Sequence, residues 1–216
     1  MKIYLVGKYG HFPIGNYSEF LKGVRTMRET ILKNIREHNE LMGLIDEACV
    51  PSIEQAALEL VKALESGNKL ISFGNGGSAA DAQHFACELV GTFEDKTRRG
   101  LPAIALSANT SSLTSISNDF SYDMVFERQI EALAQKGDLC VGISTSGNSQ
   151  NVYQALMKAK EMGCFNVAML GGDGGKIKQA ADCPIIVPST STPRIQEVHI
   201  LIIHIICSIV DEAFGE

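Results

Sequence analysis

Two segments rich in glycine and hydroxyl side chains have the composition of anion-binding turns. The first is GNGGSAADAQHF at residues 74–85, and the second is STSGNSQN at residues 144–151. Each follows an apolar run and precedes a helical pattern, so each would lie at a helix N-terminus, where unpaired backbone N–H groups and a partial positive charge favour an anion. Additional donors would be the hydroxyls of Ser144, Thr145, Ser146 and Ser149. The two turns together predict a phosphate site.

Two other interpretations of these turns are weaker. Gly and Ser are common at helix starts, so either turn alone could be a simple helix cap. Nucleotide binding is less favoured, because no Lys follows the glycines as in a Walker A loop and neither turn spells GxGxxG in full. Ligands of open α/β sheets bind at the carboxyl ends of strands, so the presence of two such turns favours phosphate binding.

A second group of residues has the side chains of a metal site. His84 and Glu88 are four positions apart and would share one face of a helix, although an ordinary polar pair has the same spacing. Gln196, His199 and His204 lie in an apolar helical segment, where an unpaired imidazole would be costly. Spacing alone pairs Gln196 with His199, because His204 lies about 12 Å of helix rise beyond Gln196. It does not decide which histidine is a ligand and which is a core residue.

The elements that must position these residues alternate in type. Apolar residues recur every three or four positions over residues 17 to about 48, which predicts a long amphipathic helix. Ser52 and Gln55 form a capping box for a second helix, and Gly67 would end it. Helical patterns then alternate with five β-like runs, at residues 69–73, 103–106, 139–143, 165–170 and 184–188.

This order predicts an α/β fold with a five-stranded parallel sheet flanked by helices on both faces. The last helical segment is apolar around nearly its whole circumference and needs burial on all sides. We therefore expect the long N-terminal and C-terminal helices to pack in an oligomer. Residues 17–216 are predicted to form a single domain, preceded by an extension of undetermined order at residues 1–16.

The bulk composition excludes several classes of partner. The 216 residues carry a net charge of -6, so no general basic surface is available for nucleic acid or anionic lipid. The sequence contains no apolar stretch of about 18 residues and no recognisable signal peptide. The six cysteines are scattered without a CxxC pair, which is typical of reduced thiols. A cytoplasmic protein without nucleic-acid or membrane partners is expected.

Four segments taken together resemble the sugar isomerase (SIS) superfamily, and within it the phosphoheptose isomerase family. They are GNGGSAADAQHFACELVG, SNDF, GISTSGNSQNV and RIQEVHILIIH. The resemblance implies an SIS-type, flavodoxin-like three-layer fold and a homotetrameric enzyme with one Zn²⁺ per subunit. It implies conversion of sedoheptulose 7-phosphate to D-glycero-D-manno-heptose 7-phosphate through an enediol, the first step of heptose synthesis for lipopolysaccharide or capsule.

The resemblance also implies the site residues. The zinc ligands fall on His84, Glu88, Gln196 and His204, which leaves His199 as a packing residue. The substrate contacts fall on Asn75, Gly76, Gly77, Glu88, Asn118, Asp119, Ser144, Thr145, Ser146, Ser149 and Gln196, with Ser78 adjacent. Carboxylates and imidazoles are suited to moving the protons of an isomerisation. We therefore expect Glu88 to be the catalytic base and His204 the catalytic acid.

The sequence departs from the family pattern at two positions. Cys87 stands where a second acidic residue often precedes the glutamate, and Pro193 stands where some members carry an aspartate near the sugar. The alternative function is a non-catalytic SIS module that binds a phosphosugar or a protein. Because such a module can lose its acid and base, the presence of both Glu88 and His204 favours an enzyme.

Overall fold

The computed structural model describes the backbone of residues 3–7, 10–14 and 17–215 and the side chains of residues 22–215. The chain divides into two compact units, residues 1–41 and residues 42–216. In the first unit, β1 (Ile3–Gly7) pairs antiparallel with β2 (Gly10–Ile14), and α1 (Tyr17–Met42) follows. The hairpin falls within the extension predicted at residues 1–16, part of which lies outside the described residues.

The boundary between the first two helices differs from the sequence prediction. α1 ends at Met42 rather than near residue 48, and α2 runs from Ile45 to Glu65, so Ser52 lies inside α2 and does not cap it. The apolar face of α2 continues on both sides of Pro51, and its burial outweighs the backbone hydrogen bond that this proline removes. The predicted helix stop at Gly67 is confirmed, since this residue has a φ of +81°.

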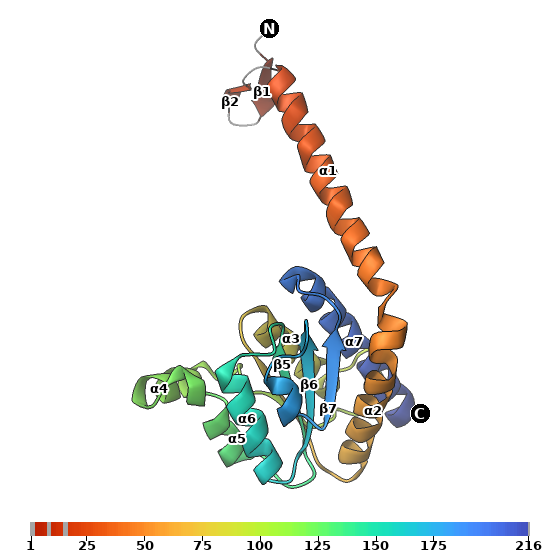
Figure 1. The fold of residues 1–216 in the computed structure, drawn as a ribbon, viewed down its shortest axis with the longest axis vertical. Helices are drawn as coiled ribbons and strands as arrows, with labels where there is room; N and C mark the ends of the chain where they lie inside the picture. Colours follow the sequence, from red (N-terminus) through yellow and green to blue (C-terminus); the bar gives the residue numbers. More distant parts are fainter. Residues whose placement is uncertain (1–2, 8–9, 15–16, 216) are drawn as a thin grey trace. The chain divides into compact units, whose positions relative to one another are not determined.

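The five predicted strands form one parallel sheet in the order β4-β3-β5-β6-β7 (Figure 1). Their bounds are β3 (Leu70–Gly74), β4 (Ala103–Ala105), β5 (Leu139–Ser144), β6 (Phe165–Gly171) and β7 (Cys183–Val187). β3 and β5 are buried along their whole length, as is typical of parallel strands covered on both faces. The predicted fold class is therefore confirmed.

The helices of the second unit cover both faces of this sheet. α2 and α3 (Gly77–Val90) both contact α7 (Thr192–Phe214) on one side. On the other side, α5 (Glu127–Leu133) packs on α6 (Gln150–Glu161), and α4 (Thr110–Asp119) is joined to them by the short helix η1 (Tyr122–Met124) (Figure 1). A second short helix, η2 (Ile177–Ala180), precedes β7. None of the helices in the described part of the chain is long and apolar enough to cross a membrane.

The strand order reverses at β3, which has β4 on one side and β5 on the other. In open α/β sheets, the crevice at the carboxyl ends of the strands beside such a reversal is the usual ligand site. Gly74, at the end of β3, pairs in register with Ile143 of β5. The two predicted anion-binding turns therefore start next to each other at this crevice.

Candidate active site

The second turn folds its hydroxyl groups over the end of β5. Ser144 is buried, and its Oγ lies 3.0 Å from the Oγ of Ser149, so one of these hydroxyls donates to the other. Gly147 makes the bend with a φ of +66°, and a Cβ at this position would lie 2.2 Å from the carbonyl oxygen of Gly174. Only glycine allows this close approach between the turn and the loop after β6.

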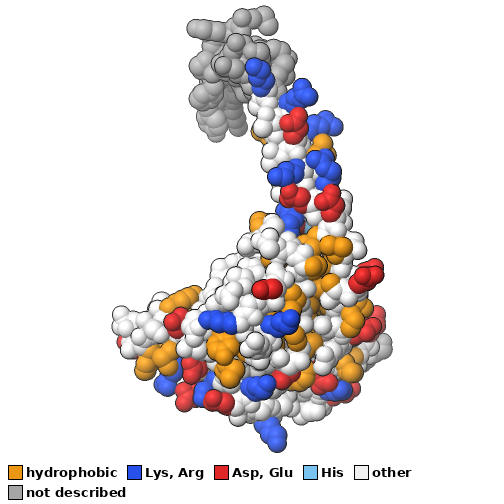
Figure 2. Space-filling model, viewed as in Figure 1, with side chains coloured by type: hydrophobic (Ala, Val, Ile, Leu, Met, Phe, Trp, Pro, Cys, Tyr) orange, Lys and Arg blue, Asp and Glu red, His pale blue; other side chains and the backbone are white. Residues whose placement is uncertain are grey.

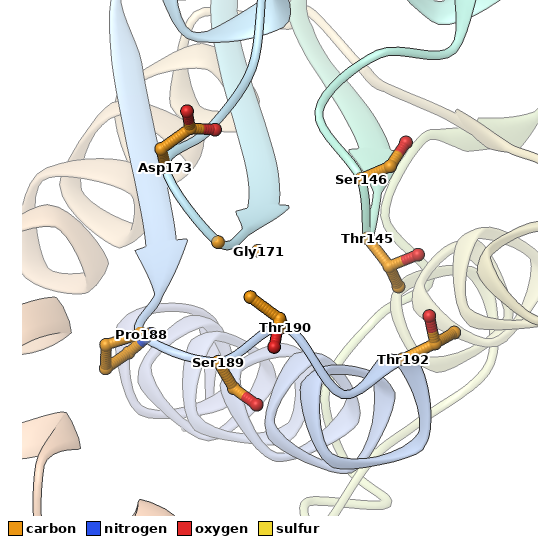
Figure 3. A pocket seen from close by; sticks show the side chains of 9 residues that line it. Thr145, Ser146, Gly171, Asp173, Pro188, Ser189, Thr190 and Thr192 are labelled. Carbon is orange, nitrogen blue, oxygen red and sulfur yellow. The ribbon is translucent and has the colours of Figure 1, made fainter.

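Thr145 and Ser146 of the same turn line a cavity of about 970 Å³ (Figure 3). Figure 3 shows these two residues on one side of the cavity and Asp173 and Pro188 on the other. The sequence prediction missed four polar residues of the lining, namely Asp173, Ser189, Thr190 and Thr192. All four follow the carboxyl ends of β6 and β7, so the position of ligand sites in α/β sheets was the signal that could have found them.

The first turn connects β3 to α3. Gly76 precedes α3 with a φ of +57°, Asn75 is half-buried, and Ser78 is buried. A Cβ at Gly77 would lie 2.3 Å from Nε2 of Gln196, so the Gln196 side chain from α7 packs directly on the first residue of α3. The absence of a side chain at Gly77 thus leaves the room that this contact needs.

The structure brings His84 together with two other residues of the predicted cluster. Nε2 of His84 lies 2.9 Å from Nε2 of His204 and 3.6 Å from Oε1 of Glu88. The imidazole rings of His84 and His204 meet edge to face with centroids 5.1 Å apart, and the Phe93 ring lies 5.3 Å from that of His204. In the hydrogen bond between the two imidazoles, one Nε2 must carry a proton and the other must accept it.

Asp81 lies one helical turn before His84, and the sequence analysis did not single it out. Its Oδ2 is buried and has no hydrogen-bond partner among the described residues. Burial raises the pKa of Asp81 to about 6, although attraction to His84 opposes the rise. A carboxyl group with a raised pKa therefore lies within electrostatic reach of His84.

His199 does not join this cluster. It is fully buried, and its Nε2 lies 3.2 Å from the carbonyl oxygen of Leu170 in β6. Because a carbonyl only accepts, Nε2 carries the proton, which leaves Nδ1 without a hydrogen bond in the described structure. Burial lowers the pKa of His199 to about 4, so the ring is neutral at pH 7. His199 is thus a core residue, as the family resemblance implied.

Asn118 and Asp119 occupy the exposed C-terminal end of α4. Nδ2 of Asn118 donates to Oδ1 of Asp119 over 2.9 Å, and Ser115 donates to the other carboxylate oxygen. In the described part of the chain, no hydrogen bond joins these two residues to the rest of the predicted site. Their predicted contact with the substrate therefore stays a prediction.

The four predicted metal ligands are not all in contact with one another. Among residues 22–215, no three His, Cys, Asp or Glu side chains are arranged so that they could hold a metal ion. His84 contacts both Glu88 and His204, whereas Gln196 contacts Gly77. Glu88 and His204 thus both contact His84. The amide of Gln196, the fourth predicted ligand, lies against the first turn.

Taken together, the fold and the site define an α/β protein with polar turns at the strand-order reversal and an imidazole–carboxylate cluster. The SIS domain family model matches residues 34–171. A phosphoheptose isomerase of Geobacter metallireducens is 54% identical over 186 residues, which cover 86% of this chain and 98% of that protein.

Two solved structures are also similar to this chain. The phosphoheptose isomerase from Neisseria gonorrhoeae is 41% identical with a TM-score of 0.81, over 86% of this chain and 99% of that one. The phosphoheptose isomerase from Francisella tularensis is 33% identical with a TM-score of 0.83, over 86% and 98% of the two chains. The chain therefore belongs to the phosphoheptose isomerase family of SIS-domain proteins.

Proposed function

We propose that this protein converts sedoheptulose 7-phosphate to D-glycero-D-manno-heptose 7-phosphate, the step that leads to heptose for surface glycans. The observation that carries the proposal is the contact of His84 with both Glu88 and His204, from two helices that start at the carboxyl edge of the sheet. This cluster provides a carboxylate and an imidazole, the two groups that proton transfer requires. Membership of the phosphoheptose isomerase family supports the choice of sugar.

The reaction moves a carbonyl group from C2 to C1 of the sugar. Glu88 takes a proton from C1 while His204 gives a proton to the C2 oxygen, which produces a 1,2-enediol. Glu88 then returns a proton to C2, and His204 takes the proton from the C1 oxygen, so that the aldose forms and both side chains recover their starting states. The contact with His84 fixes the position of the His204 ring.

The phosphate group is assigned to the second turn. Thr145 and Ser146 line the cavity, and the backbone N–H groups at the start of α6 add a favourable partial charge. The remaining substrate contacts are assigned to Asn75, Gly76, Gly77, Ser78, Glu88, Asn118, Asp119, Ser144, Ser149 and Gln196. Asp173 and Thr190, which line the same cavity, are assigned to contacts with the sugar hydroxyls.

We assign one zinc ion to His84, Glu88, Gln196 and His204, whose side chains would have to rearrange to surround it. Zinc accepts imidazole nitrogen and carboxylate oxygen, and the 3.6 Å between His84 Nε2 and Glu88 Oε1 is close to the roughly 3.4 Å that separates two ligands around one zinc. The two imidazole nitrogens, 2.9 Å apart, would separate by about half an ångström to reach this spacing. When bound, such an ion would supply Lewis-acid polarisation of the sugar oxygens.

The location, assembly and partners of the protein are proposed on the same basis, its membership of the phosphoheptose isomerase family. The protein acts in the cytoplasm as a homotetramer, with residues 17–216 of each subunit as one SIS domain. Its partner is a phosphorylated sugar, and neither nucleic acid nor a membrane takes part. The net charge of -6 supports this, because it provides no general attraction for polyanions.

An NMR assay of sedoheptulose 7-phosphate turnover tests the proposal. The wild-type protein should convert the sugar, and Glu88→Gln should lower turnover by about 10² to 10⁴-fold because it removes the base. Glu131→Gln, on the exposed surface of α5, is the matched control and should keep wild-type turnover. No turnover by the wild-type protein, with or without added zinc, would favour the non-catalytic binding module. Full turnover after treatment with a chelator would exclude a catalytic zinc.

A further inference from the structure

Asn75, at the end of β3, is held by a hydrogen-bond network that crosses the crevice to α6. Its Nδ2 donates to Oδ1 of Asn151, and Nδ2 of Asn151 donates back to Oδ1 of Asn75, both over 2.9 Å. The hydroxyl of Tyr122, from η1, donates to the same Oδ1 of Asn75 over 2.9 Å. The first turn is thereby joined to α6 and to the segment after α4.

The orientation of both amide groups follows from one backbone contact. The N–H of Val152 donates to Asn151 over 2.9 Å, so the atom it meets must be the oxygen Oδ1. Nδ2 of Asn151 then faces Asn75 and requires an acceptor, which must be Oδ1 of Asn75. The contact from Tyr122 agrees with this assignment, because a hydroxyl can donate to that oxygen.

This arrangement leaves only a hydrogen-bond donor free on the Asn75 side chain. Its Oδ1 accepts two hydrogen bonds, which use both lone pairs, and one of the two Nδ2 protons is bound to Asn151. The second Nδ2 proton has no partner among the described residues, and the side chain is only half-buried. Asn75 can therefore donate one hydrogen bond to a ligand, and its oxygen cannot accept one.

We propose that Asn151 and Tyr122 are positioning residues that make Asn75 a pure donor to an oxygen of the phosphorylated sugar. The inference rests on the proposed function, which places Asn75 at the substrate. Asn151 is buried, with 3% of its surface exposed, and makes two hydrogen bonds with Asn75, whereas Tyr122 is exposed and occupies the remaining lone pair. A phosphate or carbonyl oxygen, which only accepts, fits this donor.

Asn151→Asp is the sharpest test, because it changes the shape of the side chain very little. The second carboxylate oxygen would face Oδ1 of Asn75, and neither orientation of the Asn75 amide can then donate to both oxygens. The apparent Kd for the equilibrated mixture of the two heptose phosphates, measured by calorimetry, should rise about tenfold or more, as expected when a hydrogen bond to a charged ligand is lost. Tyr122→Phe, at an exposed position, should leave the fold intact and raise the Kd about two- to tenfold.

A double-mutant cycle distinguishes positioning from a general loss of stability. If Asn151 acts through Asn75, then Asn151→Asp should change the Kd less than about twofold in an Asn75→Ala background. Asn166→Asp is the matched control for stability, because Asn166 is also buried and donates to the Leu156 carbonyl oxygen, but lies at the amino end of β6. This variant should unfold more easily and bind the sugar phosphate normally.

The outcomes separate the inference from the function on which it rests. Wild-type binding together with unchanged Kd values in Asn151→Asp and Tyr122→Phe would overturn the positioning role alone. Additive effects of Asn75→Ala and Asn151→Asp would also overturn it. A wild-type protein that does not bind the sugar phosphate would overturn both the proposed function and this inference.

Discussion

Burial shifts the pKa values of one side chain on α3 and one on α7 in opposite directions. The carboxyl group of Asp81 is raised to about 6 and the imidazole of His199 is lowered to about 4, because burial disfavours the charged form of either group. Both groups are therefore pushed toward neutrality. Their effects on stability at low pH have opposite signs.

His199 should make the protein sensitive to acid. Its pKa in the folded state lies below the ordinary value of 6.5, so stability is full above pH 6.5 and falls as the pH drops toward 4. The loss should reach about 3 kcal/mol, since one pKa unit corresponds to about 1.4 kcal/mol. Urea unfolding at several pH values should show this loss in the wild-type protein and a smaller one in His199→Gln. Equal slopes in the two proteins would show that His199 does not titrate as its burial predicts.

At the scale of elements, a buried ion pair joins α3 to α7. Nε of Arg98 donates to Oδ1 of Asp211 on α7, and the two Nη atoms donate to the carbonyl oxygens of Glu88 and Leu89 at the end of α3. Burial alone would raise the pKa of Asp211, but hydrogen bonds from the Asp95 amide, Arg98 and the Glu94 amide lower it overall. The helices that carry Glu88 and His204 are thus fixed to each other close to these residues.

Breaking this pair should cost much more stability than breaking a surface pair. Asp211→Asn leaves the buried guanidinium of Arg98 without its counter-charge, and we expect a loss of roughly 2 to 4 kcal/mol in the free energy of unfolding. Glu131→Gln breaks the exposed pair with Arg128 and should cost less than about 1 kcal/mol. Urea unfolding of the two variants provides the comparison. Similar losses would mean that the buried pair adds nothing beyond a surface contact.

At the scale of the whole molecule, α1 presents apolar side chains to solvent in the single chain. Figure 2 shows mostly charged side chains on the visible face of α1. An exposed apolar stripe nevertheless follows the helical period, formed by Val24, Met27, Ile31 and Ile35, and Met27 is 63% exposed. Such a stripe on a helix is typical of a surface that packs on another helix. It supports the proposed homotetramer, in which α1 would contact other subunits.

Charges placed on this stripe should break the assembly. The double variant Met27→Glu, Ile31→Glu should sediment as a smaller species than the wild-type protein, because burying two carboxylates in a helix interface is costly. Thr26→Glu, on the opposite side of α1, is the control and should keep the wild-type size. A wild-type monomer, or a double variant of unchanged size, would rule out this role of α1.

Local patterns in the sequence were sufficient to predict the fold class and most elements. The five predicted apolar runs coincide with the five strands of the sheet. The apolar patterns of buried strands and of helices are set by residues close together in the sequence, so they can be recognised locally. The predicted boundary between α1 and α2 was wrong. Ser52 has the local features of a helix cap, but it lies inside α2, whose apolar face is buried by tertiary packing. The two turns were also found locally, because their Gly and Ser residues follow from the backbone conformation of a turn at a helix start.

Only the tertiary structure decided which distant residues meet. Spacing left His199 and His204 as alternatives, and packing separated them by burying His199 against Leu170 and placing His204 beside His84. The network of Asn75, Asn151 and Tyr122 was invisible in the sequence, because its members are up to 76 positions apart. Periodicity describes the face on which a side chain lies. The partner across that face is determined by the order of the strands, which brings the ends of β3 and β5 together.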